Sequence, residues 1–265
     1  MNQYQKIVLF DMDDTLSDFK TGIIPPSAYR AIELLHERKD VLVGMASGRG
    51  HFFFTEQRPD IKADAFVCVN GQCATVFDTI VFEGKVKDED VKKLYDMLEA
   101  MQGGLYAVNS FKGIKPLLEP KDAVMACAHS VTRLKDYGSS FGDEYTYHLL
   151  QAAFLPEYDG MFEKAFPHLS FHRYYEYMVD VFPKETSKLR GIEAVAKHVG
   201  LSLDDVIAFG DGMNDVEMIA GVKLGVAMGN AQAEVKAVAD HVTDTVNNDG
   251  IFKALHYLGL IKEKL

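Results

Sequence analysis

Three carboxylates and a hydroxyl lie close together in the sequence, at Asp11, Asp13, Asp14 and Thr15. They directly follow residues 7–10, an apolar run with β-branched members that predicts a buried strand. Ionised carboxylates that are packed together repel one another unless protons or a cation neutralise them. The cluster is therefore either a solvated acidic turn or a site that binds a metal ion.

Three other apolar runs also end in polar residues. These are Ser47 and Gly48 after residues 41–46, Asn70 after residues 66–69, and Asp211, Asn214 and Asp215 after residues 205–209. In open α/β sheets, ligands bind outside the carboxyl ends of the strands. If the four runs are parallel strands, their polar residues meet at one edge of a sheet.

Lys188 stands at the start of a predicted helix, ahead of the last of these runs. Acids, a lysine, a hydroxyl and an amide at one sheet edge suit phosphoryl transfer. The lysine would offset the charge of both the acids and a phosphate. Hard carboxylate oxygens favour Mg²⁺ as the metal ion.

Helical segments separate the predicted strands. Ser27 is expected to cap a helix over about residues 28–38, and Ser187 one over about residues 188–199. Apolar residues recur at helical spacing in both segments. Strands that alternate with helices are typical of a parallel sheet. The expected fold class is α/β, with a Rossmann-like parallel-sheet core.

The alternation of strands and helices is interrupted in the middle of the chain. We predict that residues 1–82 and 185–265 form the core and that residues 83–184 are an inserted α+β domain. The elements expected in the insertion are helices over about residues 88–101, 122–135 and 157–166 and a strand over about residues 175–182.

Composition limits the class of protein. The net charge of −11 disfavours a general surface for nucleic acid or for anionic membranes. Cys68, Cys73 and Cys127 lack the spacing of a zinc site and are expected to be core residues in a reducing compartment. No signal peptide and no long apolar segment is visible. We therefore expect a soluble cytoplasmic protein.

Taken together, the motifs resemble those of the haloacid dehalogenase-like phosphatase superfamily. Its four motifs are matched in order by Asp11-x-Asp13-x-Thr15, by Ser47, by Lys188 and by Gly-Asp-Gly-Met-Asn-Asp at residues 210–215. An insertion of about 100 residues between the second and third motifs resembles the Cof-type subgroup, which has a large α/β cap domain. The resemblance covers both ends of the chain, and the insertion itself carries no signature.

The resemblance implies a chemical role for each motif. Asp11 would be the nucleophile that forms an aspartyl-phosphate, and Asp13 would protonate the leaving oxygen and then activate water. The phosphate oxygens would be held by Ser47 and Lys188, and Gly48 and Asn70 would lie beside the bound phosphate. The resemblance thus implies catalytic roles for Asp11, Asp13, Ser47 and Lys188, and phosphate-binding roles for Ser47, Gly48, Asn70 and Lys188.

The resemblance also implies a metal site. Mg²⁺ would lie between Asp11, the backbone carbonyl oxygen of Asp13 and Asp211, where it would stabilise the charge on phosphorus. Around this site, Thr15 would order the loop, and Asn214 and Asp215 would hold the metal ligands and the lysine in place. Thr15, Asn214 and Asp215 would therefore support the metal ligands and Lys188 without binding the metal ion themselves.

Several residues remain open on the sequence alone. Asp14 replaces the glycine that is usual in the family, and its side chain is expected to point away from the site. Arg49 either contacts the substrate or forms a surface ion pair. His148 and the other histidines of the insertion have irregular spacing, which favours structural roles over metal binding.

The function expected from these motifs is Mg²⁺-dependent hydrolysis of a small phosphorylated metabolite. Sugar phosphates are the leading class, and nucleotide, flavin or pyridoxal phosphates remain open. Two alternatives are a phosphomutase with the same core and a regulator that binds a phosphorylated ligand without catalysis. A monomer is expected, because the inserted cap already encloses the site.

Overall fold

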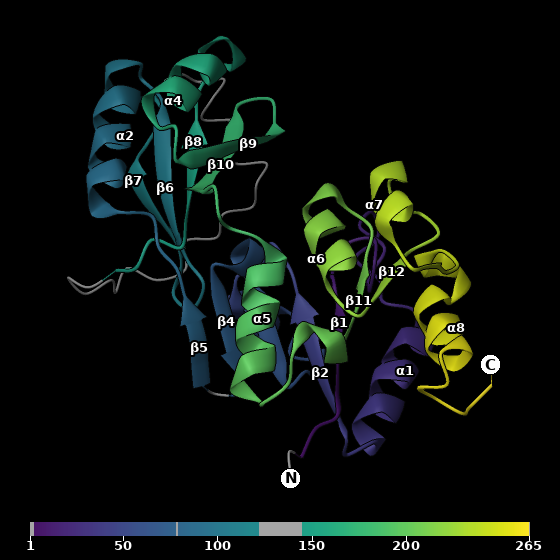
Figure 1. The fold of residues 1–265 in the computed structure, drawn as a ribbon. Coiled ribbons are helices and arrows are strands. Elements are labelled where there is room, and N and C mark those ends of the chain that lie inside the picture. Colours follow the sequence, from purple (N-terminus) through teal and green to yellow (C-terminus); the bar gives the residue numbers. More distant parts are fainter. Residues whose placement is uncertain (1–2, 78, 122–144, 265) are drawn as a thin grey trace. The chain divides into compact units, whose positions relative to one another are not determined.

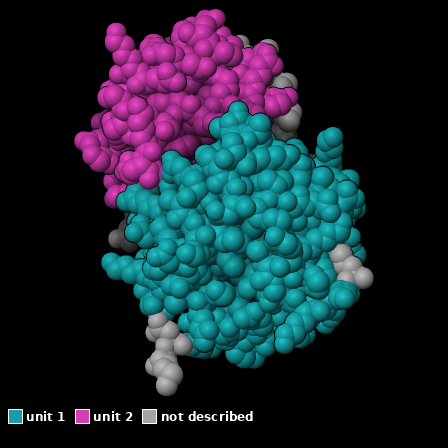
Figure 2. Space-filling model, turned by 45° about the vertical axis from the view of Figure 1, so that its right-hand side comes forward, with its two compact units in different colours: residues 1–49, 54–82, 187–265 teal, residues 50–53, 83–186 magenta. Residues whose placement is uncertain are grey.

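The structure is a computed structural model, which describes residues 3–77, 79–121 and 145–264. The described residues form two compact units, coloured separately in Figure 2. Unit 1 is Met1–Arg49, Phe54–Phe82 and Ser187–Leu265, and unit 2 is Gly50–Phe53 and Glu83–Thr186. The predicted helix over residues 122–135 and Cys127 lie outside the described residues.

Figure 1 shows the helices and strands in place. The strands are β1 (Lys6–Phe10), β2 (Val41–Ala46), β3 (Ala65–Cys68), β4 (Cys73–Val76), β5 (Thr79–Glu83), β6 (Gly104–Asn109), β7 (Gly113–Leu118), β8 (Leu149–Ala153), β9 (Leu169–Tyr175), β10 (Met178–Pro183), β11 (Val206–Gly210), β12 (Leu224–Ala227) and β13 (His241–Val242). The α-helices are α1 (Pro26–Glu37), α2 (Asp88–Ala100), α4 (Asp159–Ala165), α5 (Lys188–His198), α6 (Val216–Gly221), α7 (Ala233–Val238) and α8 (Gly250–Tyr257). Short helical turns are η1 (Phe53–Gln57), η2 (Val69–Gly71), η3 (Pro156–Tyr158), η4 (Leu203–Asp205), η5 (Met213–Asp215) and η6 (Val246–Asn248).

Unit 1 contains an eight-stranded sheet in the order β13-β12-β11-β1-β2-β3-β4-β5. The pairs from β13 to β3 are parallel, and β4 runs antiparallel to β3. The chain builds β1, β2 and β3 outward on one side and then returns to place β11 on the other side of β1. Ligands bind at such a reversal of strand order. The expected parallel α/β core is confirmed.

The strands of the core are apolar on both faces because helices cover them. Every residue of β2 and of β11 is buried, and β1 is buried from Ile7 onward. In unit 1, α1 packs beside α8, and α5 packs beside α6 and over β3 and β4 (Figure 1). Burial on both faces explains why these strands read as continuous apolar runs rather than alternating ones.

The start of α1 differs from the sequence prediction. Ser27 does not cap this helix; it lies inside the first turn and its Oγ donates to Oδ1 of Asp249, at 2.6 Å. The helix begins at Pro26, where proline is well suited because its missing N–H is not needed and its φ is already helical. By contrast, Ser187 caps α5 as expected, since its side chain accepts from the Arg190 amide.

Unit 2 contains a five-stranded sheet in the order β7-β6-β8-β10-β9, and its described strand pairs are antiparallel. Leu105, Leu150 and Val179 project from one face of this sheet into a core with Leu94 of α2 and Phe162 of α4. A separate antiparallel sheet inserted into the parallel core agrees with the predicted α+β insertion in fold class. The predicted strand near residues 175–182 is β10, and the predicted helix near residues 157–166 is α4 with η3 before it.

Candidate active site

Lys188 is fully buried and lies between two carboxylates. Its Nζ atom donates to Oδ1 of Asp11 and to Oδ1 of Asp215, both at 2.6 Å. Asp215 is fully buried as well, and Asp11 is 7% exposed. A buried charge is costly unless it is paired, so each of these groups is held by the others. The residue after β1, the first of α5 and the last of η5 thus meet at one point.

Asp215 also orders the loop that follows β11. Its Oδ2 atom accepts from the backbone N–H groups of Asp211 and Gly212, both at 2.9 Å. Together with the Lys188 bond, three donors occupy the two oxygens of this carboxylate. Asp215 therefore fixes both the lysine and the loop, which agrees with the supporting position expected for it.

Thr15 connects the loop after β1 to the loop after β11. It is fully buried, and its Oγ1 donates to Oδ1 of Asp211 at 2.7 Å. The expectation that Thr15 orders a loop agrees with this contact. Asp14 has a different contact, because its Oδ1 accepts from the backbone N–H of Phe19. Its φ of 59° is left-handed, a conformation that Asp tolerates better than most residues.

The cluster holds more negative charge than its lysine balances. Burial raises the pKa of Asp11 to about 8, while Lys188 lowers it and Asp215 raises it further. Burial also raises the pKa of Asp211 to about 7. Burial alone would lower the pKa of Lys188, but Asp11 and Asp215 outweigh it and hold that pKa above its usual value. One ammonium faces three carboxylates.

This cluster fits a metal site. One oxygen from each of Asp11, Asp211 and Asp215 lies within 4.8 Å of the others. In the described part of the chain, no hydrogen bond uses Oδ2 of Asp11 or Oδ2 of Asp211, whereas both oxygens of Asp215 are taken. Uncompensated charge and free carboxylate oxygens suit a hard divalent cation. Asp11 and Asp211 therefore offer the more available oxygens.

The Asp13 side chain pairs with Arg49. Nε of Arg49 donates to Oδ2 of Asp13 and Nη2 donates to Oδ1, each at 3.0 Å. The sequence left Arg49 open between a substrate contact and an ion pair; the structure places it in an ion pair, with a residue of the first motif. Because the partner is 36 positions away, no local signal identified it.

Ser47 and Asn70 lie at the ends of neighbouring strands. Ser47 is buried, its N–H donates to the Val67 carbonyl oxygen, and its own carbonyl oxygen accepts from the Asn70 N–H. The Asn70 side chain accepts from Nδ2 of Asn214 at 3.0 Å. A Cβ on Gly48 would lie 3.2 Å from Oδ1 of Asn70, so these loops approach closely. Asn214 thus contacts Asn70, a pairing that the sequence did not predict.

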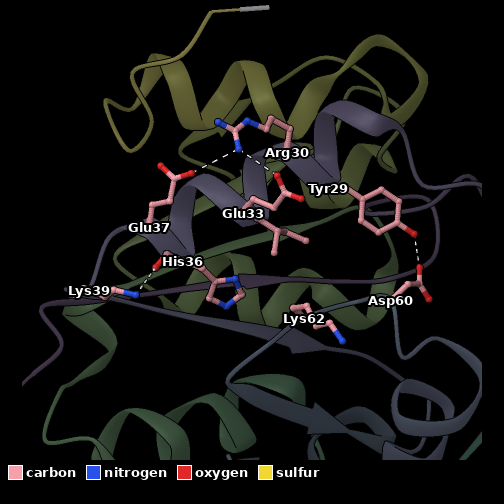
Figure 3. Close-up of a pocket in the computed structure, with 9 residues that line it drawn as sticks. Tyr29, Arg30, Glu33, His36, Glu37, Lys39, Asp60 and Lys62 are labelled. Carbon is pink, nitrogen blue, oxygen red and sulfur yellow. Dashed lines mark hydrogen bonds and ion pairs between the residues drawn. The ribbon is translucent and has the colours of Figure 1, made fainter.

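A separate pocket of about 470 Å³ lies beside α1 (Figure 3). Its lining carries charged side chains that are paired with one another, such as Arg30 with Glu33 and Glu37. Lys39, also in the lining, lies just before β2, whereas Ser47 follows the end of that strand. The pocket is thus at the opposite end of β2 from the carboxylates, and we do not assign the activity to it.

Comparison with known proteins identifies the family of this chain. A model of the haloacid dehalogenase-like hydrolases matches residues 8–255. The chain belongs to this family. Its insertion makes it a member of the Cof-type subgroup with a large cap, and its class of reaction is that of the phosphoric monoester hydrolases, as the sequence predicted. No described helix has the length and apolar character needed to span a membrane.

Three relatives illustrate the match. A Streptococcus pyogenes protein named "Putative bifunctional phosphatase/peptidyl-prolyl cis-trans isomerase" is 31% identical over 98% of this chain, which spans 55% of that relative. The Bacillus subtilis protein named "Putative phosphatase YkrA" is 29% identical over 97% of this chain and 99% of its own length. A solved structure of a subclass IIB sugar phosphatase is 26% identical, with a TM-score of 0.76 over 97% of this chain and 100% of that one.

Proposed function

We propose that this protein is a Mg²⁺-dependent phosphatase that hydrolyses small phosphomonoesters, with sugar phosphates as the leading class, through an aspartyl-phosphate on Asp11. The observation that carries the proposal is the buried Lys188 paired with Asp11, beside the uncompensated Asp211. The similarity to a sugar phosphatase supports the substrate class.

In the first step, a carboxylate oxygen of Asp11 attacks phosphorus. A bond forms between that oxygen and phosphorus, and the ester bond to the leaving oxygen breaks. Lys188 holds the Asp11 carboxylate through Oδ1, which fixes its direction before the substrate arrives. Ser47 and Lys188 hold the phosphate oxygens as charge develops on them, with Gly48 and Asn70 close by.

Asp13 transfers the protons. It gives a proton to the leaving oxygen in the first step and takes one from water in the second, when water attacks the aspartyl-phosphate and frees Asp11. It follows Asp11 by two positions on the loop after β1. A proton donor is most important for sugar and alkyl phosphates, because an alkoxide is a poor leaving group.

Mg²⁺ would be held by Asp11, by the carbonyl oxygen of Asp13 and by Asp211. When bound, it supplies a positive charge that offsets the repulsion between the anionic nucleophile and the anionic phosphate. Thr15 orients Asp211, and Asp215 orients Lys188 and the Asp211 backbone. Asn214, after β11, orients Asn70, after β3.

The two parts of the chain divide the work. Residues 1–82 and 185–265 carry the catalytic groups, and residues 83–184 serve as a cap that selects the substrate. The physiological setting is the cytoplasm, and the protein works as a monomer. The compact units support this division, since Asp11, Asp13, Lys188 and Asp211 all lie in unit 1.

The test is phosphate release from a panel of sugar, nucleotide, flavin and pyridoxal phosphates, with Mg²⁺ and with a chelator. Wild type is compared with Asp11→Asn, for which we expect a loss of activity of about a thousandfold or more. Asp14→Asn is the matched control, because it removes a neighbouring charge while its amide oxygen keeps the bond to Phe19 N–H. It should retain activity within about threefold.

Equal inactivity of wild type and Asp11→Asn on every compound would reject the phosphatase. Formation of an isomeric sugar phosphate instead of free phosphate would favour the phosphomutase.

A further inference from the structure

The carboxylate of Asp13 is held at both oxygens by one side chain. Arg49 spans it with Nε and Nη2, each at 3.0 Å, in the planar two-point geometry that a guanidinium makes with a carboxylate. Asp13 lies on the loop after β1 and Arg49 on the loop after β2. Among the described residues, no other side chain is hydrogen-bonded to the Asp13 carboxylate, so Arg49 sets its direction.

The backbone of Arg49 is fixed independently of this ion pair. Its N–H donates to Oγ of Ser47 at 3.1 Å, and its carbonyl oxygen accepts from the N–H of Val69 at 3.0 Å. The guanidinium therefore extends from an anchored point, between the ends of β2 and β3. Because its backbone is fixed and its guanidinium is paired with Asp13, Arg49 is suited to keep the Asp13 side chain in one position.

The Arg49–Asp13 pair differs from an ordinary surface ion pair in the position of its acidic residue. Arg49 and Asp13 are 41% and 35% exposed, and exposed ion pairs add little to stability. Arg38 makes the same two-point contact with Asp40 at a similar exposure, before the start of β2. What distinguishes Arg49 is its partner, which lies two residues after Asp11.

We propose that Arg49 is the positioning residue of Asp13, which it holds in the orientation needed for proton transfer to the leaving oxygen. The inference rests on the proposed phosphatase function and deepens it. Arg49 acts through Asp13 and has no contact with the substrate. Its removal lets the Asp13 side chain rotate among rotamers, so the loss appears in the proton-transfer step and not in substrate binding.

Two substrates separate a loss in the proton-transfer step from a loss in substrate binding. A sugar phosphate releases an alkoxide and needs a proton from Asp13, whereas p-nitrophenyl phosphate releases a stable phenolate and does not. We expect Arg49→Gln to lower kcat for the sugar phosphate about 10- to 100-fold, the range that a misplaced catalytic group costs. KM should stay within about threefold, and kcat for p-nitrophenyl phosphate should fall less than about threefold.

Two further variants sharpen the comparison. Arg49→Lys keeps the charge but makes one contact instead of two, so we expect it to recover part of the activity on the sugar phosphate. Arg38→Gln is the matched control, since it removes an equivalent two-point pair at the opposite end of β2, and we expect wild-type kcat and KM with both substrates.

A double-mutant cycle tests whether Arg49 acts through Asp13. Because Arg49 has no effect without its partner, Asp13→Asn with Arg49→Gln should be no slower than Asp13→Asn alone. A further multiplied loss in the double variant, a change confined to KM, or an equal loss with both substrates would overturn the proposal.

Crystal structures of wild type and Arg49→Gln provide a readout that does not depend on activity. We expect one Asp13 side-chain position on Arg49 in wild type and several rotamers in the variant. An unchanged Asp13 position in the variant would reject the inference even if the protein is a phosphatase. Failure of wild type to release phosphate from any compound would instead reject the proposed function, and the crystal structures would still decide the positioning role.

Discussion

Lys188 faces three carboxylates in a space from which most water is excluded. It contacts Asp11 and Asp215 directly, and Asp211 lies within the same cluster. The raised pKa values of Asp11 and Asp211 express the cost of holding this charge without a further cation. At the scale of residues, a bound cation and a neutral carboxylic acid are thus alternative ways to satisfy the same site.

Stability should fall as pH rises in the absence of metal. The ordinary pKa of both aspartates is 3.8, and in the fold it is raised to about 8 for Asp11 and about 7 for Asp211. Between about pH 4 and pH 8 the folded protein therefore holds protons that the unfolded chain has lost, and stability decreases with rising pH. Under the proposed function, Mg²⁺ would replace those protons, so its stabilising effect should increase with pH.

Thermal unfolding at several pH values, with a chelator and with Mg²⁺, measures this effect. At a Mg²⁺ concentration of a hundred times its Kd, we expect about 2.7 kcal/mol of added stability. In Asp211→Asn the Mg²⁺ effect should largely disappear, and the decline in stability with pH should be smaller. A Mg²⁺ effect that weakens toward high pH would contradict the assignment of these ligands.

At the scale of elements, the turn between β3 and β4 packs against the start of α5. Val69 and Asn70 both have left-handed backbones, with φ of 52° and 54°, and for a β-branched valine this is a strained conformation. Gly71 has a φ of 94°, and a Cβ there would lie 1.9 Å from the Ser187 carbonyl oxygen. The turn therefore packs directly on the residue before Lys188.

Gly71→Ala should displace the start of α5. We expect a loss of about 2–5 kcal/mol, because a left-handed backbone costs about 1–2 kcal/mol for alanine and the steric overlap adds about 1–3 kcal/mol. Gly22→Ala is the matched control: its φ is 69°, but its Cβ would meet nothing within 4 Å, so only the backbone cost of about 1–2 kcal/mol applies. Urea unfolding gives both values, and equal losses would show that the contact with Ser187 is unimportant.

At the scale of the whole molecule, the chain leaves unit 1 and enters unit 2 directly after Arg49 in the sequence. Gly50–Phe53 belongs to unit 2 although Arg49 belongs to unit 1. Within unit 2, Ser110 accepts the N–H of His51 at its Oγ and donates its own N–H to Nδ1 of His148, while Nε2 of His148 lies 2.9 Å from Glu83. A hydrogen-bonded series thus ties Gly50–Phe53 to Glu83, the first residue of the main segment of unit 2.

Acid should weaken this series within unit 2. Because Nδ1 of His148 accepts a hydrogen bond, the neutral ring carries its proton on Nε2 and donates to Glu83. Burial lowers the pKa of His148, and Glu83 opposes this in part. The unfolded chain therefore binds a proton near pH 6.5 that the folded protein does not, and stability falls as pH decreases below about 6.5.

His148→Asn is the test of this effect. Its amide oxygen can accept the Ser110 N–H but does not titrate, so the variant should be about 1–3 kcal/mol less stable at neutral pH, yet its stability should change less between about pH 6.5 and pH 5. Hydrogen exchange, corrected for the intrinsic effect of pH, should show the acid-induced loss of protection in unit 2 of wild type. The exposed His198 provides a control variant, His198→Asn, which should keep the wild-type pH dependence.

The sequence by itself determined which strands are followed by polar residues that can take part in catalysis or metal binding. The apolar runs before Asp11, Ser47 and Asp211 needed no partner to be recognised, because burial on both faces requires continuous apolar residues. Ser187 signalled the start of α5 through a local hydrogen bond. These signals are local, and they were sufficient for the parallel core, the insertion and the position of Lys188.

The tertiary structure alone decided which of these groups contact one another. The pairs Arg49 with Asp13, Asn70 with Asn214, and Ser27 with Asp249 join positions far apart in the chain, at points fixed by strand register and helix packing. A side chain such as Ser27 can cap its own helix or bond a distant loop, and only the packing of α1 beside α8 selects the second. Local sequence therefore specified the elements of the core and the candidate site residues, while long-range packing specified their hydrogen-bond partners.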